Sequence, residues 1–359
     1  MDRPANYPYT AEDDKFHTPS NDEWETETNW WSFNVPERKI GGWIHCAARP
    51  NRKRYDSRIF VWDDSGWRTE DLPYYKIVEG PLPEAADLRD ITFPNGGHTL
   101  RMLKPLMDYH ITYRDPEQDF EIEIEHRGIH LPFPFRTGEP PFRESGHFDQ
   151  AGHVIGHLKL KGERIAIDCF SVRDRSWGPR GGPHEASRPP RADTSSRFER
   201  EERGPRWRQV ERSRGRGRIQ YIFGTADAKT GFCAFVRPQD GDGSGWSPIN
   251  SGFLMREGLV SPLVKQQSRM MAFRDPVFGF SRQILVAGAD EAGRAFEAEG
   301  YAVSNMSFRG APSQNALLRW EFDNKIAWGE DQDIWRPDHA EELLKTLRDN
   351  RYGASAPIR

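Results

Sequence analysis

Three short segments combine carboxylates, arginines or imidazoles with glycine or tryptophan, and these are the places where the sequence could do chemistry. The first is HFDQ at residues 147–150, which is followed by His153 and His157. The second is RDRSWGPR at 173–180, and the third is WGEDQ at 328–332. Carboxylates and imidazoles are the usual proton donors and acceptors of enzymes, so each segment is a candidate for general acid–base catalysis.

Each segment also has a purely structural interpretation. Asp174 lies between Arg173 and Arg175, and such a carboxylate can form a buried ion pair that ties down a strand end. The WGEDQ segment can be a solvated turn, and HFDQ a polar strand edge. Convergence of Asp174 and His147 on one point favours an enzyme, whereas a closed ion pair between Asp174 and either arginine favours structure.

The elements that must position these residues are mostly β-strands. In the segment FEIEIEH, the side chains of Phe120, Ile122 and Ile124 alternate with glutamates, which predicts a half-buried antiparallel strand with its glutamates facing outward. Similar runs recur at ~8–12-residue spacing between turns rich in glycine and proline, a pattern typical of β-sandwiches and β-barrels. We therefore predict an all-β fold.

One helix is predicted, near the C-terminus. Asp338 is its expected N-cap, Leu343, Leu344 and Leu347 form an apolar stripe, and Gly353 follows its end.

The proline-rich segment 130–142 is the predicted domain boundary. It gives a first domain at 1–135, a second at 136–335, and a C-terminal helix and tail at 336–359. The arginine-rich stretch 179–218 has no hydrophobic period, and we interpret it as a solvated loop or as a lid over a ligand site.

Composition excludes several classes of protein. The 359 residues include 51 Lys and Arg and 55 Asp and Glu, so the net charge of −4 argues against bulk nucleic-acid binding. A mean hydropathy of −0.83 and the lack of a long apolar run argue against stable membrane insertion. The polar N-terminus shows no secretory signal, and the three cysteines (Cys46, Cys169 and Cys233) are far apart, so a reducing cytoplasmic location is expected. Phosphate-binding glycine motifs, GxSxG and HExxH are absent from the sequence, and no metal site is predicted.

The segments HFDQAGHVIG and GERIAIDCFSVRDRSWGPR, with FHTPSNDEWETETNWWSFNVP before them and LRWEFDNKIAWGEDQD after, resemble the carotenoid 1,2-hydratase-like superfamily. That superfamily includes the AttH-like, twin lipocalin-like proteins. Asp22 stands in an NDEW segment where a serine-bearing N-E-S-W pattern is commoner in the family, and the stretch after Gly178 is longer than usual. Arg175 replaces a more usual histidine, which would remove a proton carrier beside Asp174.

The resemblance implies two packed lipocalin-like β-barrels with a ligand channel in or between them, and acid–base chemistry without an organic cofactor. Carried onto this sequence, it makes Asp174 the general acid, His147 the partner base, and Asp149 the residue that orients His147 or a water. The expected substrate-binding residues are Trp177, Arg173, Arg175, Tyr109, His110, Glu330 and Asp331.

The implied activity is a lyase of the hydratase or dehydratase type, acting on an apolar terpenoid or phenylpropanoid-like aromatic molecule. A C–C lyase or a cyclase using the same groups is the first alternative. A non-catalytic intracellular lipid- or pigment-binding protein is the second. The sequence leaves the oligomeric state open and is compatible with a homodimer.

Overall fold

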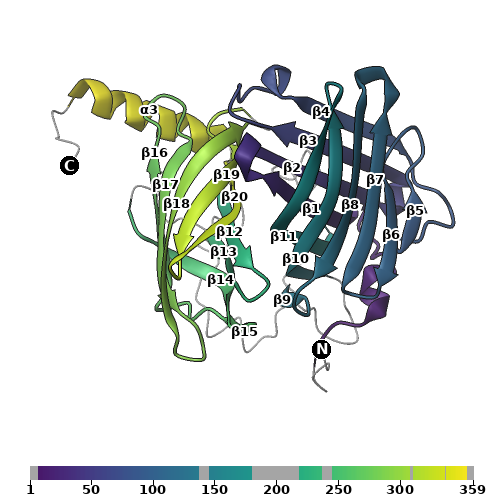
Figure 1. Ribbon diagram of the computed structural model, residues 1–359, viewed down its shortest axis with the longest axis horizontal. Coiled ribbons are helices and arrows are strands. Elements are labelled where there is room, and N and C mark those ends of the chain that lie inside the picture. The colour runs from purple at the N-terminus through teal and green to yellow at the C-terminus, as the bar shows by residue number, and fades with distance from the viewer. Residues whose placement is uncertain are drawn as a thin grey trace.

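The computed structural model describes residues 7–136, 145–179, 218–236, 245–307, 310–335 and 337–353. Two antiparallel sheets lie side by side, and one helix packs at the edge of the second (Figure 1). The predicted all-β class is confirmed. The arginine-rich stretch falls almost entirely outside the described residues, as does the N-cap side chain expected for the helix.

The first sheet is an open half-barrel with the strand order β4-β3-β2-β1-β11-β10-β8-β7-β6-β5, and β9 pairs with β10. Its strands are β1 (Glu25–Val35), β2 (Ile40–Arg49), β3 (Arg54–Trp62), β4 (Tyr74–Pro81), β5 (Asp90–Thr92), β6 (Thr99–Lys104), β7 (Asp108–Asp115), β8 (Phe120–Gly128), β9 (Phe133–Arg136), β10 (Gly146–Leu160) and β11 (Glu163–Pro179). Short 3-10 turns lie at Ala11–Asp14 (η1), Pro36–Arg38, Pro50–Arg52, Thr69–Asp71 and Pro116–Gln118.

The second sheet closes on itself because β13 pairs with both β12 and β14, which leaves β15 outside an eight-strand barrel. Its strands are β12 (Ile219–Asp227), β13 (Thr230–Val236), β14 (Ser247–Arg256), β15 (Leu259–Pro262), β16 (Arg269–Arg274), β17 (Ser281–Ala289), β18 (Ala295–Met306), β19 (Gln314–Phe322) and β20 (Lys325–Ile334). The predicted C-terminal helix is α3 (Pro337–Gly353), with Leu343 buried. No helix in the described part of the chain combines the length and the hydropathy that a membrane span requires.

The strand pairing contradicts the predicted domain boundary. The boundary at residue 135 would assign β10 and β11 to the second domain, but both strands pair inside the first sheet, where they connect β8 to β1. The second barrel begins only at Ile219. The proline-rich segment carries β9, in which Pro134 pairs with Phe148 of β10, so the chain stays in the first sheet on both sides of it. Proline is tolerated at sheet edges and bulges, so its presence does not require a change of sheet.

Each sheet encloses its own apolar core, and a third apolar cluster lies in the layer between them. The prediction for β8 is confirmed, since Phe120, Ile122 and Ile124 are each at most 1% exposed and lie in the first core. The layer between the sheets combines aromatic residues of β1 to β3 with those of β12 to β14. Its buried members are Trp30, Trp43, Phe60, Trp62, Ala151, Val172, Tyr221, Phe223, Cys233, Phe253, Met255 and Met306.

Candidate functional site

His147, Asp149 and Asp174 meet at the layer between the two sheets. β10 and β11 pair in antiparallel register, with Asp149 directly opposite Asp174 and His147 opposite Ser176. Side chains of directly paired residues point to the same face, so the three groups share one surface. His147 Nε2 lies 2.5 Å from Asp174 Oδ2 and 3.4 Å from Asp149 Oδ1. The structure therefore brings together the three residues that the sequence singled out as catalytic.

The three side chains differ in their access to solvent and in their charge. Asp149 is fully buried, while the side chains of His147 and Asp174 are 18% and 22% exposed. Burial lowers the pKa of His147, but the charges of Asp174 and Asp149 and hydrogen bonds to them outweigh it and raise the pKa to about 10. Burial raises the pKa of Asp149 to about 6, against the opposing charge of His147. The imidazole is therefore charged at neutral pH.

Aromatic residues of both sheets surround this triad. The rings of Phe135 and Phe235 lie 5.4 and 5.1 Å from the His147 ring. From the second barrel, Cys233 Sγ lies 3.9 Å from Asp149 Oδ2, and Tyr221 neighbours both groups. Sequence reasoning missed Tyr221, Cys233 and Phe235, because nothing in the β12–β13 hairpin that carries them indicates that it faces a strand from the other sheet.

Arg173 does not share the surface of Asp174. Successive strand residues point to opposite faces, and Arg173 points into the concave side of the first sheet. There it is fully buried, it lies 4.2 Å above the Tyr109 ring, and its Nε donates to Gln150 at 2.7 Å. The Tyr109 hydroxyl donates to Asp14 at 2.7 Å. The structure thus places Arg173 and Tyr109, both expected substrate-binding residues, in a buried polar core away from the triad.

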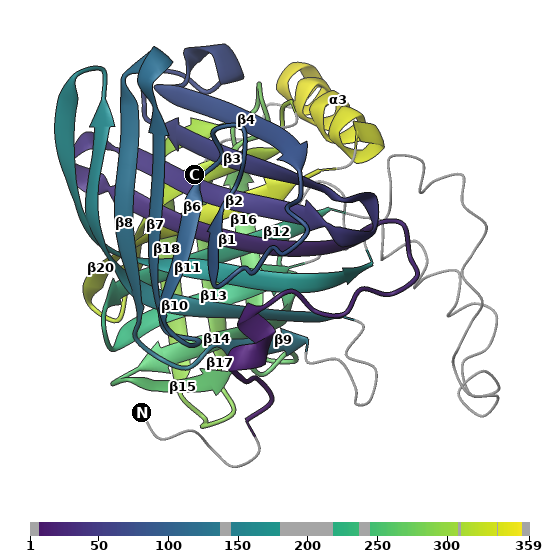
Figure 2. The same cartoon turned by 90° about the vertical axis from the view of Figure 1, so that its right-hand side faces the viewer.

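Arg175 and Trp177 lie on the same concave side and hold the N-terminal segment. Arg175 forms an ion pair with Glu27 and donates to the carbonyls of Asp13 and Lys15. Trp177 stacks on His17 with ring centroids 3.9 Å apart. Figure 2 shows the N-terminal segment, in purple, running past the ends of β10 and β11. We correct the expectation for both residues: they anchor the chain and do not line the surface of the triad.

This arrangement also changes the meaning of Arg175 in the family motif. A histidine at position 175 would point away from Asp174, so its replacement by arginine removes no proton carrier from the site. The imidazole beside Asp174 comes instead from His147 on the neighbouring strand.

The third candidate segment divides between two places. Glu330 faces the first sheet and accepts a hydrogen bond from Ser32 at 2.5 Å, and Ser32 in turn contacts Ser171. Burial raises the pKa of Glu330 to about 8, against the hydrogen bond from Ser32. Asp331 points into the second barrel, where Gln220 and Gln314 each donate to it at 2.9 Å. Glu330 therefore belongs to the layer between the sheets, and Asp331 does not.

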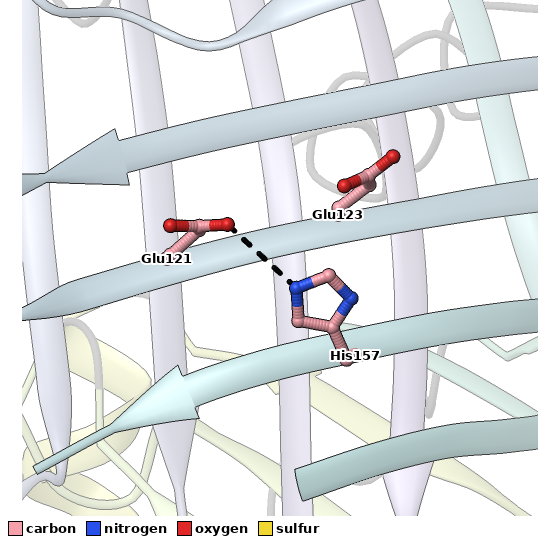
Figure 3. Close-up of side chains that lie close together, drawn as sticks. All are labelled: Glu121, Glu123 and His157. Carbon is pink, nitrogen blue, oxygen red and sulfur yellow. Dashed lines mark ion pairs between the residues drawn. The ribbon is translucent and has the colours of Figure 1, made fainter. Parts of the chain in front are cut away.

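A second group of two carboxylates and an imidazole lies on the outer surface of the first sheet (Figure 3). His157 Nε2 lies 3.7 Å from Glu121, while Glu123 pairs with His110, another expected binding residue, at 2.9 Å. Arg164 approaches the other nitrogen of His157 at 3.1 Å. Like the triad, this cluster places three ligand-type atoms within 4.8 Å of one another. It is a network of polar side chains on the outer face of the sheet, with Glu121 and Glu123 partly exposed, and His110 lies in it rather than near Asp174.

A groove of about 840 Å³ runs along the outside of the second barrel. Arg269 stacks on the half-exposed Trp246 there, with its guanidinium 4.5 Å from the ring, and Lys265 lies nearby. No member of the triad lines this groove. The triad and the groove are therefore separate features of the molecule.

Comparison with known proteins supports the fold. Residues 10–187 match a family model described as a domain of unknown function, DUF7064. A search of curated proteins finds no match. A crystal structure of an AttH-like protein from Nitrosomonas europaea is 12% identical, covers 89% of this chain and 95% of its own, and superposes with a TM-score of 0.54.

Two further solved structures are similar over most of their length. CghA with Sch210972 is 10% identical over 92% of this chain and 96% of its own, with a TM-score of 0.51. Kievitone hydratase from Nectria haematococca is 9% identical, covers 89% of this chain and 90% of its own, and has a TM-score of 0.48. The likeness to the AttH-like protein and CghA shows that this chain shares their fold.

Proposed function

We propose that the protein is a lyase of the hydratase or dehydratase type, with His147, Asp149 and Asp174 as its acid–base groups. The observation that carries this proposal is the position of the His147 imidazole, 2.5 and 3.4 Å from two carboxylates in an aromatic layer between two sheets. Perturbed titratable groups brought together from separate chain segments are typical of active sites.

The roles of the two main groups are the reverse of those expected from the sequence. Because the pKa of His147 is raised to about 10, its imidazolium is the proton donor at neutral pH. Asp174, which is partly open to solvent, is the partner that accepts a proton. Asp149 is fully buried and holds the imidazole from the other side. Microscopic reversibility makes the same groups serve addition and elimination.

Hydration then proceeds in balanced steps. The proton of His147 adds to one carbon of a substrate double bond, whose π electrons form the new C–H bond. A water oxygen bonds to the adjacent carbon, and the Asp174 carboxylate takes the proton that this water releases. The short contact between Asp174 and His147 returns that proton to the imidazole. General acid–base catalysis of this type is worth roughly 10²–10⁴-fold.

The substrate class follows from the surroundings of the triad. Phe135, Phe235 and Tyr221 offer ring faces that bind apolar molecules and stabilise developing positive charge. These contacts support a terpenoid or an aromatic, phenylpropanoid-like substrate, and the proton transfers require no organic cofactor. A C–C lyase or a cyclase would use the same two acid–base groups, but a C–C bond would be broken or formed instead of the C–O bond.

Isotope labelling tests the proposal. The purified chain is incubated in ¹⁸O-labelled water with 4-vinylphenol, a prenylated phenol and a linear terpene alcohol, and products are analysed by mass spectrometry. A product that gains one labelled water, formed by the wild type and lost in Asp174→Asn and His147→Gln, is expected. Activity should survive treatment with a chelator. Variants that match the wild type in turnover would refute the assignment, and tight binding without turnover would favour a carrier.

A further inference from the structure

The wall opposite the triad contains a row of residues that runs across the second barrel. Phe235, Tyr221, Gln332, Asn315 and Met306 are direct register partners on five neighbouring strands, β13, β12, β20, β19 and β18. Directly paired residues of a sheet point to the same face. The row therefore lies on one face of the barrel.

That face is the one turned toward the first sheet. Tyr221 and Met306 both belong to the apolar cluster between the sheets, and Phe235 packs against it. The Tyr221 ring lies 6.3 Å from Trp30 of the first sheet, and the Phe235 ring lies 5.1 Å from His147. One end of the row thus touches the proposed catalytic site, and Asn315 lies farther along.

Asn315 is the anomaly in this row. It is fully buried, and neither its amide nitrogen nor its amide oxygen has a hydrogen-bond partner among the described residues. Its neighbour Gln332 is engaged differently, since its amide donates to Glu330 at 3.4 Å. A buried polar group without a partner costs about 1–3 kcal/mol, and such groups in native proteins require an explanation. An apolar residue of similar size would avoid this cost, so the amide is suited to a partner from outside the chain.

One further donor faces the same layer, because Trp30 Nε1 is buried and has no hydrogen-bond partner within the described chain. The Tyr221 hydroxyl lies beside Asp149, and its hydrogen bond opposes the rise in the pKa of that carboxyl. Two strand spacings separate Tyr221 from Asn315, which corresponds to roughly 10 Å along the row. A ligand that follows the row from the triad would therefore meet aromatic contacts first and an amide at its far end.

We propose that Asn315 is a specificity-determining residue that binds an oxygen-bearing group of the substrate, which makes that substrate an oxygenated compound rather than a pure hydrocarbon. This inference deepens the proposed function and rests on the triad being the reacting end. An amide offers both a donor and an acceptor, so it can bind a hydroxyl or a carbonyl. A hydrocarbon would leave the amide desolvated and unpaired, and this penalty would oppose its binding.

A pair of rigid probes tests the proposal without any need for turnover. Binding of 4-hydroxybiphenyl and 4,4′-dihydroxybiphenyl is measured by calorimetry and by quenching of tryptophan fluorescence. The two molecules differ only in the second phenol at the far end. The wild type should bind the diphenol at least about tenfold more tightly, which is about 1.4 kcal/mol. The variant Asn315→Leu should bind the two probes equally.

Two control variants separate the possible failures. Asn305→Leu changes an asparagine with an unpaired oxygen on β18 whose side chain, next to Met306, points to the opposite face of the barrel wall, and it should keep the preference. Asp174→Asn should also keep it, because the far phenol does not reach the triad. If turnover fails but the preference and its loss in Asn315→Leu are observed, the proposed function is wrong and the binding residue is right.

Thermal melting gives an independent readout. Replacement of an unpaired buried amide by leucine should leave the melting temperature of the free protein unchanged or higher, a trade-off typical of binding residues. Equal binding of the two probes by the wild type, retention of the preference in Asn315→Leu, or no binding of either probe would each overturn the inference. A sharply lower melting temperature of Asn315→Leu would do the same, because it would show that the amide has a structural partner such as water.

Discussion

The protein contains two groups that each combine one imidazole with two carboxylates, and their surroundings differ. His147, with Asp149 and Asp174, lies in the layer between the sheets, and Asp149 is fully buried. His157, with Glu121 and Glu123, lies on the outer face of the first sheet, where the two glutamates are 36% and 50% exposed. Both groups draw on β10, and both place their ligand atoms within 4.8 Å of one another.

The difference shows how burial converts the same residue types into different chemistry. Near the surface, water and salt screen the attraction between an imidazolium and a carboxylate, so such pairs contribute little. Between the sheets the screening is weaker, and two carboxylates raise the pKa of His147 to about 10 against the opposing effect of burial. Four experiments sharpen this contrast, ordered from the largest expected effect to the smallest.

Substitution of Asp174, in the layer between the sheets, should have the largest effect. Asp174→Asn keeps the shape of the side chain but cannot accept a proton, so we expect turnover to fall roughly 10²–10⁴-fold with the fold intact. The matched exposed variant, Glu121→Gln, should leave turnover unchanged. Turnover and melting temperature are measured on the same samples. Equal turnover of Asp174→Asn and the wild type would remove the catalytic role, and parallel loss of activity and fold would make Asp174 structural.

The pH dependence of stability should also report the raised pKa of His147. A histidine whose pKa rises from 6.5 to about 10 on folding stabilises the folded state fully below pH 6.5. This contribution is lost as the pH rises through about 10, and it amounts to on the order of a few kcal/mol. Urea unfolding at pH 6, 8 and 10 should show the free energy of unfolding falling in the wild type and in His157→Gln, with a flatter profile in His147→Gln. Parallel profiles for all three proteins would contradict the raised pKa.

Glu330 tests how burial alone changes the pKa of a carboxyl that forms no ion pair with the described residues. Because its pKa is raised to about 8, it is largely protonated at pH 7 and closely resembles an amide. Glu330→Gln should therefore change the free energy of unfolding little at pH 7. Glu330→Ala removes the acceptor of the Ser32 hydrogen bond and should cost about 1–3 kcal/mol. Chemical denaturation measures both variants, and a large cost of the glutamine variant would show that Glu330 is charged.

The smallest effect is expected at the exposed group. His157→Gln should change the free energy of unfolding by less than about 0.5 kcal/mol, because its partners are screened by solvent. Denaturation in low and high salt checks this, and the same measurement on His147→Gln serves as the buried counterpart. A loss of more than about 1 kcal/mol in His157→Gln would mean that the outer cluster is a site in its own right.

Local patterns in the sequence were sufficient to predict the strands. Alternation of apolar and charged residues placed Phe120, Ile122 and Ile124 inside, because a strand has a period of two whatever it packs against. The leucine stripe of the last helix was readable for the same reason, since helical periodicity is a property of a single segment. The family resemblance at 173–180, rather than a local pattern, pointed to Asp174 with His147 as its expected partner.

Only the tertiary structure decided on which face of its sheet each of these side chains lies and which groups it contacts there. The return of β10 and β11 to the first sheet set the boundary between the sheets, and this pairing depends on partners more than one hundred residues away. The same pairing turned Arg173, Arg175 and Trp177 inward against the N-terminal segment. The charge of His147 depends on two carboxylates whose effect on its pKa outweighs that of burial, and the Asn315 amide is unusual only because no described residue of the folded chain forms a hydrogen bond with it. Burial and long-range pairing are properties of the folded chain, so no local pattern of residues could have specified them.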